Sequence, residues 1–234
     1  MQNHSLYTWK DASIISIVGP DTEKFLQGYI TSDISKGTSN ALLPMAITDL
    51  KGRVLCSGWT IKQENGVDLI VHKSLKQSIE LFLKPYIQFS KSKLIETQKI
   101  VCHSNTGFSL WDEMFLQLKE TSTDLAPSDQ KDEDLSRLLT LNKFVFIQEC
   151  LSGKFLPQHL GLHLANAVDF DKGCYLGQEI VARVQFRGSV KKEIRQVDLA
   201  LGEYQVGDQL KDNSTLVQIS RSGLGLAVSK IEQH

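Results

Sequence analysis

The strongest constraint on the fold comes from a pair of strand-like segments joined by a tight turn. Residues 54–62 and 67–71 are rich in apolar and β-branched side chains, and Asn65-Gly66 separates them. Asn-Gly is typical of two-residue hairpins because both residues tolerate positive φ. A third strand-like segment, 42–48, comes before the turn formed by 49–52. These residues therefore predict a three-stranded antiparallel meander.

Helical signals alternate with the strands. Residues 22–27 follow Asp21, a typical N-cap, and apolar residues recur at helical spacing over 75–83. Pro85 is expected to end or kink the second helix, because proline lacks the backbone N–H that a helix needs. Helices mixed with antiparallel hairpins predict an α+β fold and not a doubly wound sheet.

The chain has 234 residues, which fits one large domain or two smaller ones. Residues 121–134 are polar, acidic and contain a proline, so we expect an exposed linker there. Beyond residue 190, glycine and Asn/Asp punctuate short strand-like segments, a pattern typical of a small β-barrel or sandwich. We therefore expect a main region over 1–190 and a small C-terminal region over 191–234.

Composition excludes several classes of protein. The net charge is −1, so there is no overall field that would attract nucleic acid, and any anion site must be local. There is no apolar run of 18 residues and no signal-like N-terminus, so we expect a cytoplasmic protein without membrane contact. The four cysteines form no CxxC pair, which argues against a zinc ribbon, a thioredoxin site or a disulfide framework.

The most informative local stretch places Cys174 between Gly173 and Gly177, next to Lys172 and Tyr175. A helical pattern begins immediately afterwards, at Gln178. A cysteine near a cation and a helix N-terminus is expected to have a lowered pKa and increased reactivity. Cys174 is therefore the candidate catalytic residue, whereas the other cysteines are expected to serve in packing or to lie on the surface.

Basic residues gather near this stretch. Arg183 and Arg187 share one face if the helix extends that far, and further cations are found in the 49–53 turn and after the helix: Lys51, Arg53, Lys191, Lys192 and Arg195. Together with Lys172 they would bind a polyanion such as a glutamate tail or a phosphate. An ordinary solvated charged surface explains the same pattern equally well.

Other motifs carry less weight. His159 and His163 have metal-chelating spacing, but no HExxH glutamate accompanies them, so we expect surface or capping histidines and no metal site. Gly223-Leu224-Gly225 lacks the third glycine and the strand–helix setting of a dinucleotide fingerprint.

The octapeptide Lys-Gly-Cys-Tyr-Leu-Gly-Gln-Glu at 172–179 resembles the signature of the YgfZ family, folate-binding proteins related to the glycine-cleavage T-protein. The similarity extends to the blocks at 19–33 and 49–53, to Leu156-Pro157-Gln158, and to the run 182–191. Family members often carry asparagine where this chain has Gly161.

The resemblance implies a T-protein-like fold, with ferredoxin-like subdomains around a central folate cavity and a small C-terminal β-barrel. It implies tetrahydrofolate as cofactor and a function in assembling or repairing iron–sulfur clusters in client enzymes, including radical-SAM enzymes that modify tRNA. Cys174 would be the reactive or cluster-contacting thiolate, which Lys172 would keep ionised. Tyr175 and Glu179 would orient the folate or the turn, and Arg183 would hold an anion. The remaining candidate cofactor-binding residues are Lys51, Arg53, Gly173 and Gln178.

Two alternatives stay open at this point. A T-protein-like chain could be a tetrahydrofolate-dependent aminomethyltransferase, although the T-protein lacks the signature cysteine. It could also be a scaffold that binds folate without performing chemistry, in which case Cys174 would behave as an ordinary thiol.

Overall fold

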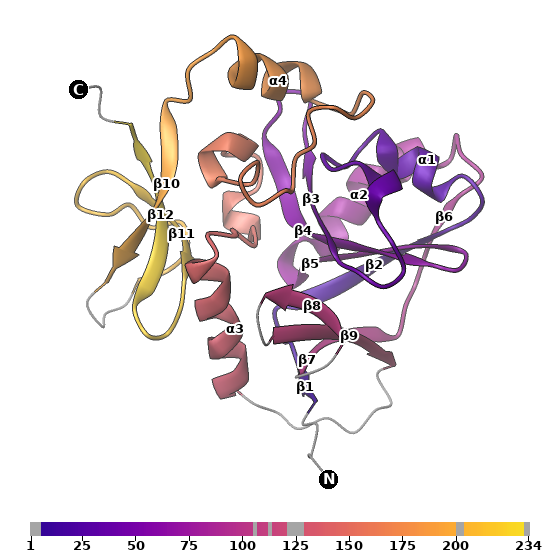
Figure 1. The fold of residues 1–234 in the computed structure, drawn as a ribbon, viewed down its shortest axis with the longest axis horizontal. Coiled ribbons are helices and arrows are strands. Elements are labelled where there is room, and N and C mark those ends of the chain that lie inside the picture. The colour runs from indigo at the N-terminus through magenta and orange to yellow at the C-terminus, as the bar shows by residue number, and fades with distance from the viewer. Residues whose placement is uncertain (1–5, 105–106, 112–113, 121–128, 200–203, 232–234) are drawn as a thin grey trace.

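The computed structural model describes residues 6–104, 107–111, 114–120, 129–199 and 204–231. Within them the chain forms three antiparallel sheets with helices between and beside them, so the predicted α+β class is confirmed (Figure 1). The described helices are α1 (Thr22–Gln27), α2 (Lys76–Ile87), α3 (Asp129–Leu141) and α4 (Gln178–Phe186). Short 3-10 helices include Ile34–Lys36, Lys73–Leu75, Glu149–Leu151 and Pro157–Leu160.

The first sheet has the strand order β3-β4-β5-β2-β6. Its strands are β2 (Ala12–Val18), β3 (Leu43–Thr48), β4 (Val54–Gln63), β5 (Gly66–His72) and β6 (Lys93–Ile95). The neighbours β3, β4 and β5 are the predicted meander, and the turn at Asn65-Gly66 joins β4 to β5. Gly66 has no room for a side chain, because a Cβ there would lie 2.1 Å from the carbonyl oxygen of Ile17.

Helix α2 packs against β2 and β6 and buries Ile79, Leu83 and Ile87. Pro85 lies inside it, and the helix continues to Ile87. Of the two expected effects of Pro85, the end of the helix is wrong, because burial of Leu83 and Ile87 on one face holds the last turn on the sheet despite the missing N–H. A kink at Pro85 stays a prediction.

The second sheet has the order β1-β7-β9-β8, built from β1 (Tyr7–Thr8), β7 (Lys99–Ser104), β8 (Phe108–Trp111) and β9 (Met114–Glu120). The ammonium of Lys99 on β7 contacts the buried carboxylate of Asp68 on β5 at 2.7 Å, and Ser16 donates to that carboxylate at 2.5 Å. A buried carboxylate needs such partners. This ion pair therefore connects the first two sheets.

The expected linker over 121–134 is only partly a loop. Residues 121–128 lie outside the described residues, but α3 begins at Asp129, within the stretch that the sequence assigned to a loop. The start of this helix was not predicted, because its first turns are polar in composition. The helix is stabilised by apolar residues in its later part, where Leu135 and Leu139 are buried in the core.

The third sheet has the order β10-β12-β11, from β10 (Lys192–Asp198), β11 (Thr215–Ile219) and β12 (Leu224–Lys230). In the described part of the chain these three strands form an open sheet, so the expected C-terminal β-barrel is wrong. Three strands are too few to close on themselves at normal strand tilt. Val217, Leu226 and Val228 pack into the main core. The division at residue 190 remains a prediction.

The core is centred on aromatic rings from distant segments. Trp59 on β4 stacks on Phe144 with centroids 4.4 Å apart, and Trp9 lies 4.7 Å from Phe146. Residues 144–147 are all buried although they belong to no helix or strand. Ser57 satisfies their backbone by donating to the carbonyl of Val145 at 2.5 Å and accepting from the N–H of Ile147 at 3.0 Å. This segment is thereby fixed beneath the first sheet.

Candidate functional site

The candidate site forms where the β3–β4 turn meets the N-terminus of α4 (Figure 1). Gly177, the N-cap of α4, has φ +84°, and a Cβ there would lie 2.3 Å from the carbonyl oxygen of Asp49. Gly52 in the turn has φ +71°, and its Cβ would lie 3.0 Å from Val181. Only glycine combines this backbone conformation with so close an approach. The structure therefore brings the Lys51-Gly52-Arg53 turn and the cysteine stretch together.

Buried hydrogen bonds hold the loop that carries Cys174. The N–H of Asp169 donates to the carbonyl of Thr31 at 2.9 Å, and the N–H of Leu176 donates to that of Gly28 at 3.0 Å. The hydroxyl of Thr48 donates to the carbonyl of Leu176 at 2.6 Å. The loop is thus tied to both α1 and β3, on either side of the cysteine.

Lys172 is buried and points into the protein. Its ammonium donates to the carbonyls of Gln27, Ile30 and Ser32 at 2.8, 2.7 and 2.9 Å. These three acceptors use all three ammonium hydrogens. The expectation that Lys172 keeps the Cys174 thiolate ionised or contacts folate does not agree with this geometry. Lys172 instead anchors the loop to the C-terminal end of α1, where the helix dipole favours a cation.

The environment of Lys172 acts on its pKa in two directions. Burial lowers the pKa of Lys172 to about 8, and the carboxylates of Asp33 and Asp169 act in the opposite direction. The three carbonyl acceptors also favour the charged form. The ammonium lies 5.2 Å from the centre of the Tyr175 ring, a cation–π distance. Lys172 therefore remains a charged group at neutral pH inside a largely apolar site.

Tyr175 and Gln178 also stabilise the loop that carries Cys174, and they are not arranged to bind a ligand. Tyr175 is buried, and burial raises the pKa of its hydroxyl, which has no hydrogen-bond partner among the described residues. The side chain of Gln178 accepts from the N–H of Tyr175 at 3.3 Å. Gly173 is exposed, and a Cβ there would meet no atom within 4 Å. Within this turn only Gly177 has a positive φ, and Gly173 does not.

Cys174 is exposed and lines an open depression of about 700 Å³. The depression is formed by the loop, the first turns of α4, Gly28 and Leu50. Leu50, at the tip of the β3–β4 turn, is 74% exposed. Gly28 and Leu50 were not among the residues predicted for the site, and only their position within the family-like blocks marked them.

Of the charged candidates Lys51, Arg53, Glu179, Arg183 and Arg187, Glu179 lines this depression and the others do not. Glu179 and Arg183 form an exposed ion pair at 2.9 Å along α4. Arg53 is exposed and donates to the carbonyl of Gly153 at 3.3 Å, and Lys51 is exposed beside it. Arg187 is the C-cap residue of α4, because the helix ends at Phe186.

The Leu156-Pro157-Gln158 segment supports α4 from below. Gln158 is buried and donates to the carbonyl of Val181 at 2.8 Å. His159 accepts from the N–H of Leu156 at 3.4 Å, which confirms the expected capping role. Burial, with help from Lys192 and Arg53, lowers the pKa of His159 to about 4. Gly161 has φ +67°, a left-handed conformation that glycine adopts readily, and a Cβ there would lie 2.9 Å from Cγ2 of Ile194.

A second, smaller cavity of about 290 Å³ lies beside Trp59, at the meeting point of β3, β4, β8 and the end of α3. Phe144, Leu164 and Ala165 supply apolar walls, and polar groups come from Ser109, Asn142 and Asn166. No sequence motif predicts this cavity, because the residues that line it are mostly apolar or amide residues scattered along the chain.

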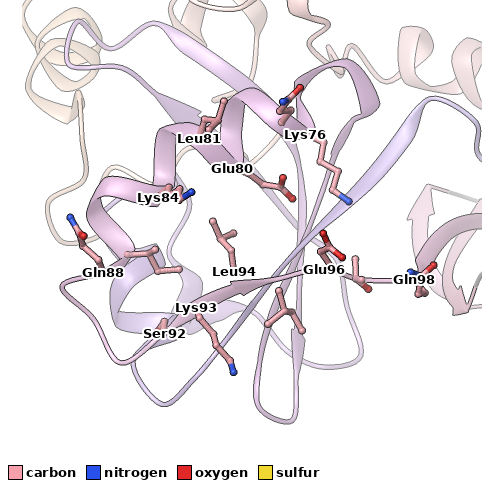
Figure 2. Close-up of a pocket in the computed structure, with 14 residues that line it drawn as sticks. Lys76, Glu80, Leu81, Lys84, Gln88, Ser92, Lys93, Leu94, Glu96 and Gln98 are labelled. Carbon is pink, nitrogen blue, oxygen red and sulfur yellow. The ribbon is translucent and has the colours of Figure 1, made fainter.

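A groove of about 830 Å³ lies between α2 and β6, and its lining does not include the cysteine (Figure 2). Leu94 points into it beneath Glu80 and Lys84, and Lys76 and Glu96 lie toward one end. Charges of both signs line it, and it contains no cysteine or histidine. None of the predicted site residues belongs to this groove.

Two further properties bear on function. In the part of the chain that the structure describes, no group of three His, Cys, Asp or Glu side chains is placed to hold a metal ion. None of the helices among the described residues has both the length and the apolar character required to span a membrane.

Comparison with solved structures shows the fold. The chain superposes on aminomethyltransferase T of the glycine cleavage system from Bartonella henselae with a TM-score of 0.61 and 10% identity, over 97% of this chain and 78% of that one. The fold is therefore that of the T-protein, as the resemblance implied.

Comparison of sequences gives the family. No family model matches the chain. The protein named tRNA-modifying protein YgfZ from Escherichia coli strain SE11 is 30% identical over 229 residues, covering 81% of this chain and 70% of the relative. Proteins of the same name from Escherichia fergusonii and Klebsiella pneumoniae strain 342 are each 29% identical with the same coverage. With this identity over most of both sequences and the signature Lys172–Glu179 in place, the chain belongs to the YgfZ family.

Proposed function

We propose that this protein is a folate-binding accessory factor that supports the assembly or repair of iron–sulfur clusters in tRNA-modifying enzymes. The observation that carries the proposal is the presentation of Cys174. Its side chain is exposed, yet buried hydrogen bonds fix the loop on both sides of it. A thiol held in this way reaches a second macromolecule without a prior rearrangement of the loop.

The chemistry of Cys174 follows from its position. A thiolate is a soft ligand and a nucleophile, suited to iron–sulfur chemistry. Iron–sulfur clusters are commonly held by four thiolates. Among the described residues Cys174 has no second cysteine or histidine beside it that would complete such a set. The cluster therefore belongs to the client enzyme, and Cys174 supplies one thiolate ligand to it.

The cavity beside Trp59 suits the ring of a folate. A pterin ring is flat and apolar on its faces, with hydrogen-bonding groups on its edge. Trp59, Phe144 and Ala165 offer apolar walls, and Asn142 and Asn166 offer amide groups. The volume of about 290 Å³ accepts the ring but not the whole cofactor, so the glutamate tail would extend outside. Bound tetrahydrofolate would supply a carrier of one-carbon units.

This placement revises the expected cofactor contacts. Lys172, Tyr175 and Gln178 hold the Cys174 loop, so we no longer assign them to folate. Glu179 lines the cysteine depression, Arg183 is its ion-pair partner, and Lys51 and Arg53 lie in the turn that contributes Leu50, so these four remain candidates for charged contacts. The folate ring and the thiol are thus assigned to separate cavities.

The proposal is tested by complementation in a bacterium that lacks its own family member. Cys174→Ala should fail to restore the activity of an iron–sulfur tRNA-modifying enzyme, measured as the modified nucleoside in total tRNA. Cys150→Ala is the matched control, because Cys150 is also exposed and free but lies elsewhere. Full rescue by Cys174→Ala would contradict the role of the thiol and favour a scaffold.

The folate part is tested separately with purified protein. Tetrahydrofolate should change tryptophan fluorescence through Trp59, and Ala165→Phe, which fills the cavity, should weaken binding by about tenfold or more. Absence of binding at high micromolar tetrahydrofolate would remove folate from the proposal. Release of methylene-tetrahydrofolate from an aminomethylated lipoyl carrier would instead identify an aminomethyltransferase.

A further inference from the structure

The surface around Cys174 is larger than the depression that contains the thiol. A second depression of about 400 Å³ along α4 is lined by Glu179, Ala182, Arg183, Phe186 and Arg187. It shares Glu179 and Ala182 with the Cys174 depression, so the two form one continuous surface. The shared residues lie on one face of α4, because side chains three and four positions apart line up on a helix.

This surface exposes large apolar side chains. Phe186 is 69% exposed, and its ring packs edge-on against the half-buried Phe170, with centroids 5.4 Å apart. Leu50 is 74% exposed and lines the same depression as Cys174. Single exposed apolar residues are common, but two of them on one continuous surface that also carries an exposed thiol indicate an interaction site.

Among the charged residues that line the two depressions, Arg183 and Arg187 are basic and Glu179 is acidic. Glu179 is paired with Arg183, and the Asp49 carboxylate accepts from the N–H groups of Lys51 and Arg53. Within the described residues neither Lys51 nor Arg187 forms an ion pair with a carboxylate. The protein as a whole has a net charge of −1, so this local excess is not a general property of its surface.

We propose that the surface formed by Leu50, Cys174, Ala182, Phe186 and Arg187 is the docking site for the client protein, and that the client presents an acidic patch around an apolar pocket. This inference rests on the proposed function and adds the place and chemistry of the encounter. Aromatic and arginine side chains are the residues that most often dominate protein–protein binding energy. A free polyglutamate tail or a phosphate would need the cations but not Phe186 and Leu50.

The geometry also agrees with the need for a partner at this place. One thiolate cannot hold a cluster alone, so the remaining ligands must come from another protein that brings its iron within reach of Cys174. A partner that covers both Phe186 and Leu50 would cover the two adjoining depressions, one of which Cys174 lines. Docking would also exclude water from the thiol and strengthen its electrostatic interactions.

The test uses the purified tRNA-modifying enzyme whose activity depends on this protein in the complementation experiment. Its affinity is measured by calorimetry with wild type, Phe186→Ser and Arg187→Glu. Each variant should weaken binding by about tenfold or more. Two matched controls change residues outside the proposed docking site. Phe89→Ser removes a ring that is 85% exposed. Lys84→Glu reverses a charge in the α2–β6 groove (Figure 2). Both controls should remain within about twofold of wild type.

Salt and alternative ligands complete the test. Higher salt should weaken client binding by the wild type more than client binding by Arg187→Glu, because the variant has lost part of the charge attraction. Phe186→Ser should retain tetrahydrofolate binding. Unchanged client binding by Phe186→Ser, or no complex between wild type and the enzyme at high micromolar concentration, would overturn the docking site. The docking site would also be overturned if Arg187→Glu lost binding of pentaglutamyl-folate or tRNA while client binding stayed intact.

The two proposals fail in distinguishable ways. If Cys174→Ala loses rescue while Phe186→Ser and Arg187→Glu keep both client binding and rescue, the docking site is wrong and the proposed function stands. If Cys174→Ala rescues as well as wild type, the thiol role is wrong, whatever the docking variants do.

Discussion

Gly52 and Gly177 lie in direct contact, and a Cβ on Gly177 would lie only 2.9 Å from the Cα of Gly52. Both residues have positive φ, at +71° and +84°. The β3–β4 turn and the N-terminus of α4 can therefore approach as closely as two backbones allow. Two sequence blocks that are distant in the chain become one structural unit through this contact, and Cys174 lies at its edge.

The two glycines that flank Cys174 should respond differently to substitution. Gly177→Ala places a methyl group 2.3 Å from the carbonyl oxygen of Asp49 at a positive φ, so it should lower the free energy of unfolding by about 3 kcal/mol. Gly173→Ala meets open space and should change it by less than about 0.5 kcal/mol. Urea denaturation of both variants measures the difference, and equal effects would contradict the geometry.

Lys172 should act as a structural anchor. Lys172→Met keeps an unbranched chain of similar length but removes the ammonium from the carbonyls of Gln27, Ile30 and Ser32. Loss of these buried charge-assisted bonds should lower the free energy of unfolding at pH 7 by about 2 kcal/mol. Lys36→Met is the control, because Lys36 contacts Asp169 of the same loop from an exposed position. Unchanged or increased stability of Lys172→Met would show that the ammonium is dispensable.

Thiol labelling should separate the cysteines by exposure. In the native state iodoacetamide should modify Cys150 and Cys174, whereas Cys56 and Cys102 are buried. Burial also raises the pKa of Cys56 to about 12 and that of Cys102 to about 11, which keeps these thiols protonated. Intact mass spectrometry should show the two buried thiols reacting only in denaturant. Cys174→Ser should remove one of the native adducts, and labelling of Cys56 in the folded protein would contradict the structure.

His159 should make stability depend on pH. Its pKa is lowered to about 4 by burial first and then by Lys192 and Arg53, whereas an unfolded histidine titrates near 6.5. Between these values the unfolded chain binds a proton that the folded protein does not. The free energy of unfolding should therefore fall as pH decreases from about 6.5 to 4, by about 2 kcal/mol from this residue.

The variant His159→Gln isolates that contribution. Glutamine retains an acceptor for the N–H of Leu156 but does not titrate. Denaturant unfolding between pH 7 and 4 should show a shallower slope for the variant. Some slope should remain, because the pKa values of His72 and His163 are also lowered by burial. Parallel slopes for wild type and variant would mean that His159 is not protected from protonation.

The sequence predicted elements whose signals are local. Helices α1 and α4 were expected over 22–27 and 178–186, and the structure places them there. The capping hydrogen bond expected from Asp21 does not form. Apolar spacing and the glycines beside each helix act within a few residues, so they can be read directly. The β3-β4-β5 meander was predicted for the same reason, from Asn65-Gly66. The signature around Cys174 also identified the family from sequence alone.

The tertiary structure decided what each side chain does. A lysine next to Gly-Cys suggests an exposed cation that acts on the thiol. Lys172 instead points into the protein, because the chain after α1 turns so that three carbonyl groups lie within hydrogen-bond distance of its ammonium. No local sequence pattern predicts these acceptors. The early start of α3 and the open third sheet likewise depend on packing between distant segments.

The cysteine turn was thus visible in the sequence, but its surroundings were not. The charges of Lys51, Arg183 and Arg187 were visible as a pattern that an ordinary solvated surface explains equally well. Only the fold places the exposed side chains of Phe186 and Leu50 on one continuous surface with Cys174. The residue types come from the sequence, whereas their juxtaposition comes from non-local packing, in which each contact depends on all the others.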